Sequence, residues 1–168
     1  ALPQPEAVAG YFADVAVLAY PTPADYTIPD IEGKSALVRR DVPPSAEYET
    51  LPPAQVLPRG RIVDLTARLG PYARLSWEVP EGKWTVLRLA HTPTGAQNAP
   101  SPATGRGLEC DKLSRRGAEA HFAGLMGRLI SDCGELSGKT LVATHIDSWE
   151  TGSQNWTPRF REEFIRLR

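Results

Sequence analysis

Residues 140–158 read TLVATHIDSWETGSQNWTP, and this stretch decides the fold expected for the second half of the chain. Residues 140–146 form a short, mostly apolar run, which is typical of a strand buried on both faces. Thr157 and Pro158 are typical of the N-cap and the first position of a helix. Residues 147–156 therefore connect the C-terminal end of a strand to a helix, and parallel α/β architectures build their active sites there.

A long amphipathic helix is predicted before this strand. Ser114 is a suitable N-cap and Gly134 a suitable residue after the last turn, so the helix is expected over residues 115–133. Apolar side chains recur there at spacings of three and four: Ala118, Phe122, Leu125, Met126, Leu129, Ile130 and Cys133. A helix followed by a buried strand is half of a βαβ unit.

Residues 1–100 are expected to be mainly β. Most of the 16 prolines fall in this half, and proline interrupts helices and central strands. Strands are predicted over residues 15–20, 35–39 and 61–65, and a proline-rich loop over residues 41–58.

The clearest local signal is a predicted β-hairpin over residues 74–90. Apolar and polar side chains alternate up to a turn at residues 80–83. The second strand, residues 84–90, carries apolar side chains on both faces, as a strand of a β-sandwich does. The fold class expected from these patterns is α+β, with a β-rich, sandwich-like half followed by a βα portion.

The composition limits the class of partner. Lysine and arginine number 19 against 20 acidic residues, so the net charge of -1 gives no electrostatic reason to expect nucleic acid or an anionic membrane surface. No apolar run reaches the roughly 20 residues that cross a bilayer, so no membrane insertion is expected. The chain begins at Ala1 without a methionine and stops at Arg168 within a predicted helix, so we expect a segment of a longer protein.

The two cysteines, Cys110 and Cys133, stand in no CxxC pair and at no metal-ligand spacing from the histidines. Cys133 lies on the apolar stripe of the predicted helix, where a cysteine usually acts as a small buried hydrophobe. A disulfide between the two cysteines is the alternative.

The connection over residues 147–156 combines side chains that suit a sugar site. Indole rings stack on the apolar faces of pyranoses, amides and carboxylates bind hydroxyl groups, and glycosidic cleavage needs a carboxylic acid beside the bridging oxygen. Glu150 is the candidate acid. The candidate substrate-binding residues of this connection are Asp147, Trp149, Asn155 and Trp156. The structural alternative is a turn capped by Asp147, with both tryptophans in the core and Glu150 in solvent.

Two further places are candidates for substrate binding. Residues 105–112 concentrate charge just before the predicted helix, and Glu109 and Asp111 are the carboxylates among them. The alternative is a lead-in to the helix in which Asp111 and Ser114 act as caps. His91, at the end of the predicted hairpin, is a candidate hydrogen-bond partner for a sugar, or it belongs to a simple turn.

Several motifs together resemble one known family, the family 106 glycoside hydrolases. They are DVAVLAYPTP at residues 14–23, WTVLR at 84–88, HTPTG at 91–95, GLECDKLS at 107–114, DSWE at 147–150 and QNWTP at 154–158. The resemblance covers about residues 10–168. The DSWE and QNWTP motifs are its most specific part, whereas HTPTG is weak by itself.

The resemblance implies a large bacterial α-L-rhamnosidase, secreted or periplasmic, that releases L-rhamnose from rhamnose-containing glycans. It implies a (β/α)8 catalytic barrel with a β-rich insertion, so residues 1–100 would be the insertion and residues 101–168 a partial barrel segment. Glu150 would be the general acid of an inverting mechanism assisted by bound calcium. A second carboxylate about 6.5–9.5 Å away would activate water, and we expect it beyond Arg168. Glu109 and Asp111 would support the substrate or the calcium ion.

Two other functions stay open from the residues alone. The aromatic side chains of the β-rich half also suit a non-catalytic carbohydrate-binding or interaction module. A metal-independent hydrolase of another deoxysugar or of a uronic acid is the other, because loops determine specificity. Whether the whole protein is a rhamnosidase or another glycoside hydrolase, the isolated chain is expected to be inactive, since it lacks a convincing catalytic base.

Overall fold

The structure is a computed structural model that describes residues 1–24, 52–53, 56–145 and 154–168. The chain divides into two compact units, Ala1–Thr94 and Gly95–Arg168, and each is described by itself. The strand predicted over residues 35–39 and most of the loop predicted over residues 41–58 lie outside the described residues.

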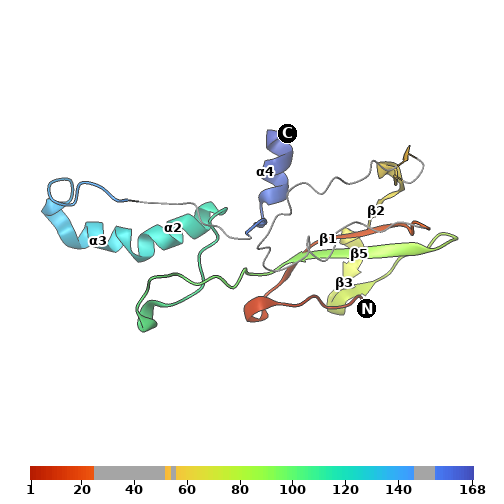
Figure 1. The fold of residues 1–168 in the computed structure, drawn as a ribbon, viewed down its shortest axis with the longest axis horizontal. Helices are drawn as coiled ribbons and strands as arrows, with labels where there is room; N and C mark the ends of the chain where they lie inside the picture. The colour runs from red at the N-terminus through yellow and green to blue at the C-terminus, as the bar shows by residue number, and fades with distance from the viewer. Residues whose placement is uncertain (25–51, 54–55, 146–153) are drawn as a thin grey trace. The chain divides into compact units, whose positions relative to one another are not determined.

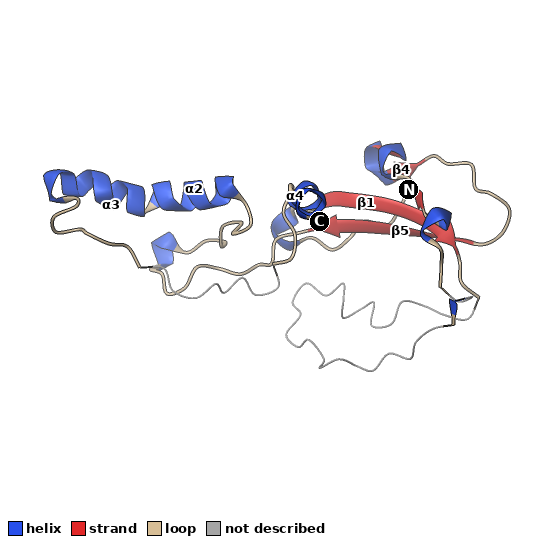
Figure 2. Cartoon of the chain, turned by 90° about the horizontal axis from the view of Figure 1, so that it is seen from above, coloured by secondary structure: helices blue, strands red, loops and turns tan. Residues whose placement is uncertain are grey.

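The first unit is built on a three-stranded antiparallel sheet in the order β2-β1-β5 (Figure 1). Strand β1 is Ala13–Pro21, β2 is Val63–Asp64 and β5 is Trp84–His91. Strands β1 and β5 pair from one end to the other, with one register irregularity between Asp14 and Ala16 (Figure 2). The apolar run predicted as a strand over residues 15–20 is confirmed as the middle of this sheet, whereas the strand predicted over residues 61–65 is reduced to β2.

The core of the first unit lies against β1. Val17, Ala19 and Leu65 are buried, and the partly buried side chains packed on them are Leu2, Val63, Leu69, Leu75, Trp77 and Trp84. Leu65 also bonds to the backbone of β1: its N–H donates to the carbonyl oxygen of Val17 at 2.8 Å. Burial of apolar area against this one strand therefore holds together segments that lie far apart in the sequence.

The hairpin predicted over residues 74–90 is wrong. Strand β5 pairs with β1, and Arg74–Leu75, which is strand β4, pairs with β3 at Leu69–Gly70. The long apolar run of β1 pairs with β5 along the whole length of β5. The first arm of the expected hairpin contributes only Arg74–Leu75, and it does so to the separate sheet of β3 and β4. The two arms still touch through Trp77 and Trp84, whose rings meet edge to face with centroids 5.2 Å apart.

A bidentate ion pair ties β1 to β5 near the N-terminus. Arg88 donates from Nε to Asp14 Oδ1 at 2.6 Å and from Nη2 to Asp14 Oδ2 at 2.9 Å. Its third donor, Nη1, reaches the carbonyl oxygen of Pro3 at 2.8 Å, and its guanidinium lies 5.4 Å from the ring centre of Phe12. The hydrogen bond with Asp14 raises the pKa of Arg88 above its ordinary value, so the guanidinium keeps its positive charge.

The second unit contains three α-helices among its described residues: α2 (Arg115–Gly124), α3 (Met126–Cys133) and α4 (Phe160–Leu167) (Figures 1 and 2). The single helix predicted over residues 115–133 is interrupted at Leu125, which has φ -126° and ψ -71°. Glycines on both sides of Leu125, at 124 and 127, lower the helix propensity there. Both predicted ends are confirmed, because Ser114 Oγ accepts from Gly117 N–H and Gly134 ends α3 with φ 49°.

The strand predicted over residues 140–146 is wrong over its described part. Residues 142–145 belong to no strand, Leu141 makes one isolated bridge with Ser137, and Val142 is 71% exposed. A buried parallel strand needs a strand beside it, and no strand among the described residues lies in a ladder with residues 142–145. The described fold is thus a small α+β mixture with small antiparallel sheets, and it confirms neither a sandwich nor a barrel portion.

Cys110 and Cys133 are both free thiols, so the alternative of a disulfide is not found. Cys133 is partly exposed instead of fully buried, because the apolar face of α3 is largely uncovered. Within the described ranges, no helix is long and apolar enough to cross a membrane.

Truncation of Leu65 tests the core of the first unit. Leu65 is 1% exposed, so Leu65→Ala should lower the free energy of unfolding by about 2–5 kcal/mol through lost burial and a residual cavity. Urea unfolding followed by circular dichroism measures the change. The matched control is Val79→Ala, because Val79 is 60% exposed and should change stability by less than about 0.5 kcal/mol. Equal effects of the two variants would contradict this description of the core.

Candidate functional site

The carboxylate of Asp111 is the centre of the polar network in the second unit. Its Oδ1 accepts from the backbone N–H of Leu113 at 3.0 Å and from Gln154 Nε2 at 2.6 Å. Its Oδ2 accepts from Thr157 Oγ1 at 2.8 Å. Both oxygens of one side chain therefore join the start of helix α2 to residues more than 40 positions later in the sequence.

The local sequence explains why Asp111 is held in place. The carbonyl oxygen of Asp111 accepts from the N–H of Ser114 at 3.1 Å, and this turn leads directly into α2. Gly117, in the first turn of α2, lies so close that a Cβ there would overlap the carbonyl oxygen of Asp111. The glycine is needed for this close approach of helix and turn.

The segment of residues 154–157 is held at both of its ends by Asp111. Thr157 is only 6% exposed, and Gln154 is partly buried. Between them, Asn155 is exposed and Trp156 is partly buried, with its ring 5.3 Å from the ring centre of Phe160. The segment thus presents an amide and an indole on a backbone that is fixed by hydrogen bonds before and after them.

The predicted start of the last helix is corrected by the same network. Thr157 and Pro158 were expected as N-cap and first helical residue, but α4 begins at Phe160 with Arg159 as its N-cap. The hydroxyl of Thr157 donates to Asp111 instead of accepting from the helix backbone. A hydrogen bond to a carboxylate is stronger than a neutral cap, and this bond directs the hydroxyl group of Thr157 toward Asp111.

A second polar contact arranges the loop before Asp111. The side chain of Asn98 donates to the carbonyl oxygen of Gly105 at 2.9 Å and accepts from the N–H of Gly107 at 2.7 Å. Two backbone bonds join the same two sides of the loop. Asn98 N–H donates to Gly107 O at 3.0 Å, and Glu109 N–H donates to Ala96 O at 2.9 Å. Asn98 was not found from the sequence, although asparagine between glycines and prolines is a typical turn signal.

The carboxylate of Glu109 faces a cation instead of open solvent. Glu109 Oε2 lies 3.2 Å from Lys112 Nζ, with side chains 31% and 24% exposed. The partial burial makes this pair less screened than a fully exposed one. Its predicted role in substrate binding stays a prediction.

The carboxylates among the described residues are the candidates for holding a metal ion. No group of three or more histidine, cysteine, aspartate or glutamate side chains gathers there at metal-binding distance. The oxygens of Asp111 already accept three hydrogen bonds, and Glu109 is paired with Lys112. These donors do not form a calcium site, which needs six to eight oxygen ligands.

The other predicted site residues lie outside the Asp111 network or outside the described residues. Asp147, Trp149 and Glu150 lie outside the described residues. His91 ends β5 in the first unit, paired in register with Ala13, and its ring meets Tyr11 at 6.1 Å between centroids. The structure therefore brings Asp111 together with the segment that carries Asn155 and Trp156, a contact that the sequence did not predict.

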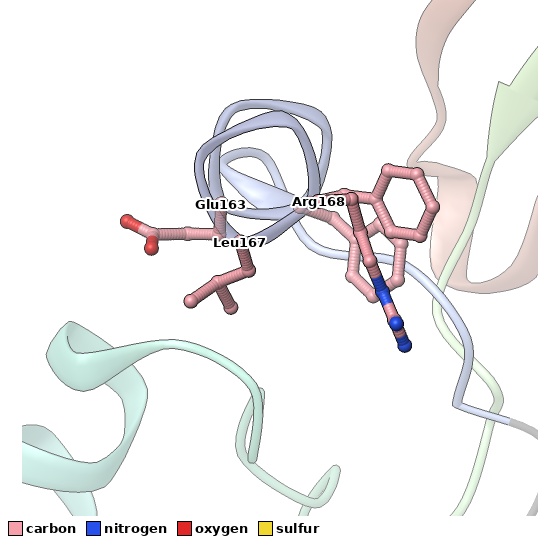
Figure 3. A pocket seen from close by; sticks show the side chains of 5 residues that line it. Glu163, Leu167 and Arg168 are labelled. Atoms are coloured by element: carbon pink, nitrogen blue, oxygen red, sulfur yellow. The ribbon is translucent and has the colours of Figure 1, made fainter.

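A separate apolar concavity lies on helix α4. It is lined by Phe160, Glu163, Phe164, Leu167 and Arg168 (Figure 3). The rings of Phe160 and Phe164 stack with centroids 6.4 Å apart, and Figure 3 shows Glu163 and Arg168 extending away from each other. The hydrogen bond from Arg166 lowers the pKa of Glu163. This surface holds no convergent polar groups and is distinct from the Asp111 network.

Comparisons with known proteins give a family. The model of glycoside hydrolase family 106, described as alpha-L-rhamnosidase, matches residues 2–168. A curated protein of Formosa agariphila named "Putative beta-glucuronidase" is 39% identical over 170 residues, which cover 99% of this chain and 14% of that protein. The chain thus spans about a seventh of the length of this relative. No solved structure matches.

Two glycines of α2 provide a test of the contact between the helix and Asp111. Gly117→Ala should destabilise the second unit by about 1–3 kcal/mol, because the new methyl group overlaps backbone that cannot move freely. Gly124→Ala is the matched control: nothing lies within 4 Å of its Cβ position, so it should stabilise by about 0.4–1 kcal/mol through reduced freedom of the unfolded chain. Thermal unfolding measures both. A stabilising Gly117→Ala would contradict the described contact.

Proposed function

The chain belongs to glycoside hydrolase family 106, and on this premise we propose that it is a segment of a hydrolase that releases L-rhamnose from α-L-rhamnosides of plant or bacterial polysaccharides. The observation that carries the proposal is family membership over essentially the whole chain. The exposed residue Asn155 and the indole of Trp156 support it, because they are side chains suited to a sugar and lie on a segment that Asp111 bonds at both ends.

In the proposed reaction Glu150 is the general acid. As the glycosidic bond breaks, the protonated carboxyl group of Glu150 transfers its proton to the leaving oxygen, while water attacks the anomeric carbon from the opposite face. A second carboxylate about 6.5–9.5 Å from Glu150 takes the proton of that water, so the configuration inverts. The position of Glu150 follows from the DSWE motif alone, and the base is expected beyond Arg168.

Asn155 and Trp156 are proposed to bind the sugar. The amide of Asn155 donates and accepts at once, which suits vicinal hydroxyl groups. The indole of Trp156 suits the apolar face of a pyranose, and its ring is in contact with that of Phe160 on the following helix. Asp147, Trp149, His91 and Glu109 stay candidates for substrate binding from the sequence.

Cleavage of a β-glucuronide is the second candidate, because the Formosa agariphila relative is named for it. A glucuronide carries a carboxylate, and an enzyme usually binds that group with a cation. Near Asp111, Lys112 is already paired with Glu109. The rhamnoside stays the first candidate, because the family model that matches residues 2–168 is described as alpha-L-rhamnosidase.

Calcium and localisation rest on the family resemblance alone. The described donors do not complete a calcium site, so no step of the reaction is derived through a metal. Assay of the full-length protein after chelation, and after re-addition of Ca²⁺, tests the metal. A secreted or periplasmic location is proposed on the same ground and is tested by fractionation of the producing cells.

Replacement of the proposed acid tests the mechanism. In the full-length protein, Glu150→Gln should lower hydrolysis of an aryl α-L-rhamnoside by about 10²–10⁴-fold, because the amide has no proton to donate to the leaving group. The control is Glu119→Gln, whose carboxylate is 68% exposed on α2 and should leave turnover unchanged. Steady-state kinetics measures both variants. Near-normal turnover by Glu150→Gln would remove Glu150 from the mechanism.

A panel of aryl glycosides tests the sugar. The full-length protein should cleave the aryl α-L-rhamnoside in preference to the aryl β-D-glucuronide, and product analysis by NMR should show inverted anomeric configuration. Preference for the glucuronide would support the second candidate instead. Sugar binding by the isolated chain, together with full activity of Glu150→Gln in the longer protein, would support the non-catalytic module.

A further inference from the structure

We propose that Asp111 is a positioning residue of the sugar site, which acts on substrate only through residues 154–157. This inference rests on the proposed function, because it assumes that Asn155 and Trp156 contact the sugar. Asp111 holds the residue before this pair, Gln154, through Oδ1 and the residue after it, Thr157, through Oδ2. The two bonds of one carboxylate therefore fix both ends of the segment that presents the amide and the indole.

The hydrogen-bonding capacity of Asp111 supports a positioning role over direct sugar contact. An ionised carboxylate has about four favourable acceptor directions. Three are used by Leu113 N–H, Gln154 Nε2 and Thr157 Oγ1. A sugar hydroxyl that bound the same oxygens would have to compete with donors that are already in place at 2.6–3.0 Å.

The two bonds from Asp111 to Gln154 and Thr157 form what we call the Asp111 clamp. Asp111 is itself held in place, which is what a positioning role requires. Asp111 is fixed by its own backbone bond to Ser114, and Ser114 caps α2 by accepting from Gly117. Thr157 is buried, so its bond to Asp111 is shielded from water. A side chain that is held by its own neighbours can hold a binding segment to the precision that recognition needs.

Within the described part of the chain, the other contacts of residues 154–157 are made to helix α4. The backbone N–H of Phe160 donates to the carbonyl oxygen of Thr157 at 3.0 Å, and the rings of Trp156 and Phe160 are in contact. Both of these contacts are made to the helix that follows. The bonds to Asp111 are the described contacts that tie residues 154–157 to the loop before α2, so their loss should release Asn155 and Trp156 from that loop.

The experiment is a double-mutant cycle between Asp111→Asn and Thr157→Val in the full-length protein, run on whichever aryl glycoside the wild type cleaves. Each single variant should raise KM about 10-fold, the effect of losing a hydrogen bond to a charged group, while kcat stays within about 3-fold. The double variant should have the KM of Asp111→Asn within about 2-fold, because both changes break the same contact. Thr157→Ser keeps the hydroxyl group and should restore the wild-type KM.

Hydrogen–deuterium exchange provides a readout that does not depend on turnover. The peptide that contains residues 154–160 should exchange faster in Asp111→Asn than in the wild type, because the clamp no longer holds it. Asp14→Asn is the matched control: Asp14 is also a carboxylate with two hydrogen bonds, both to Arg88 of the first unit. It should lower thermal stability without changing KM or the exchange of this peptide.

Three results would overturn the positioning role: additive effects on KM, a fall of kcat at unchanged KM, or unchanged exchange of the peptide. The first would mean that Asp111 contacts the sugar itself. A wild-type protein that cleaves none of the glycosides would overturn the proposed function, and the positioning role with it. That failure is distinguishable, because in the other three cases the wild-type protein is active.

Discussion

One carboxylate, that of Asp111, organises the second unit. Its three acceptor contacts connect the turn before α2, the amide of Gln154 and the hydroxyl of Thr157. These groups come from places in the sequence that no local rule joins. Among the described residues, these bonds are what ties residues 154–157 to the loop that precedes α2.

The first unit depends on a comparable constraint, which is apolar instead of polar. Strand β1 buries Val17 and Ala19, and every strand that pairs in its sheet pairs with it. Its apolar run is long enough to take β5 along its whole length, so β5 does not form a hairpin with the residues immediately before it. Local alternation predicts that a strand exists and does not predict its partner, because antiparallel pairing between neighbours and between distant segments buries side chains in the same pattern.

In the candidate site, too, the residue types were predicted from the sequence, whereas their contacts were not. The charge cluster at residues 105–112 and the amide and indole at Asn155 and Trp156 were found from the residue types, as was the alternative that Asp111 and Ser114 act in the lead-in to a helix. The structure adds that Asp111 bonds to Gln154 and Thr157, of which the first was quoted only as part of a motif and the second was predicted as a helix cap. Long-range hydrogen bonds between side chains leave no periodic signal, so no pattern in the sequence could have shown this contact.

The sequence by itself determined the properties that depend on neighbours along the chain: the α+β class, the apolar strand within β1, the cap at Ser114, the end of α3 at Gly134, and the family. Backbone conformation and short-range burial depend on residues a few positions apart, so such signals survive in the sequence. Only the tertiary structure decided the partner of β5, the lack of a strand over residues 142–145 and the bonds from Asp111 to Gln154 and Thr157. Each of these is a choice among competing partners, and its outcome depends on which distant groups the folded chain brings within reach.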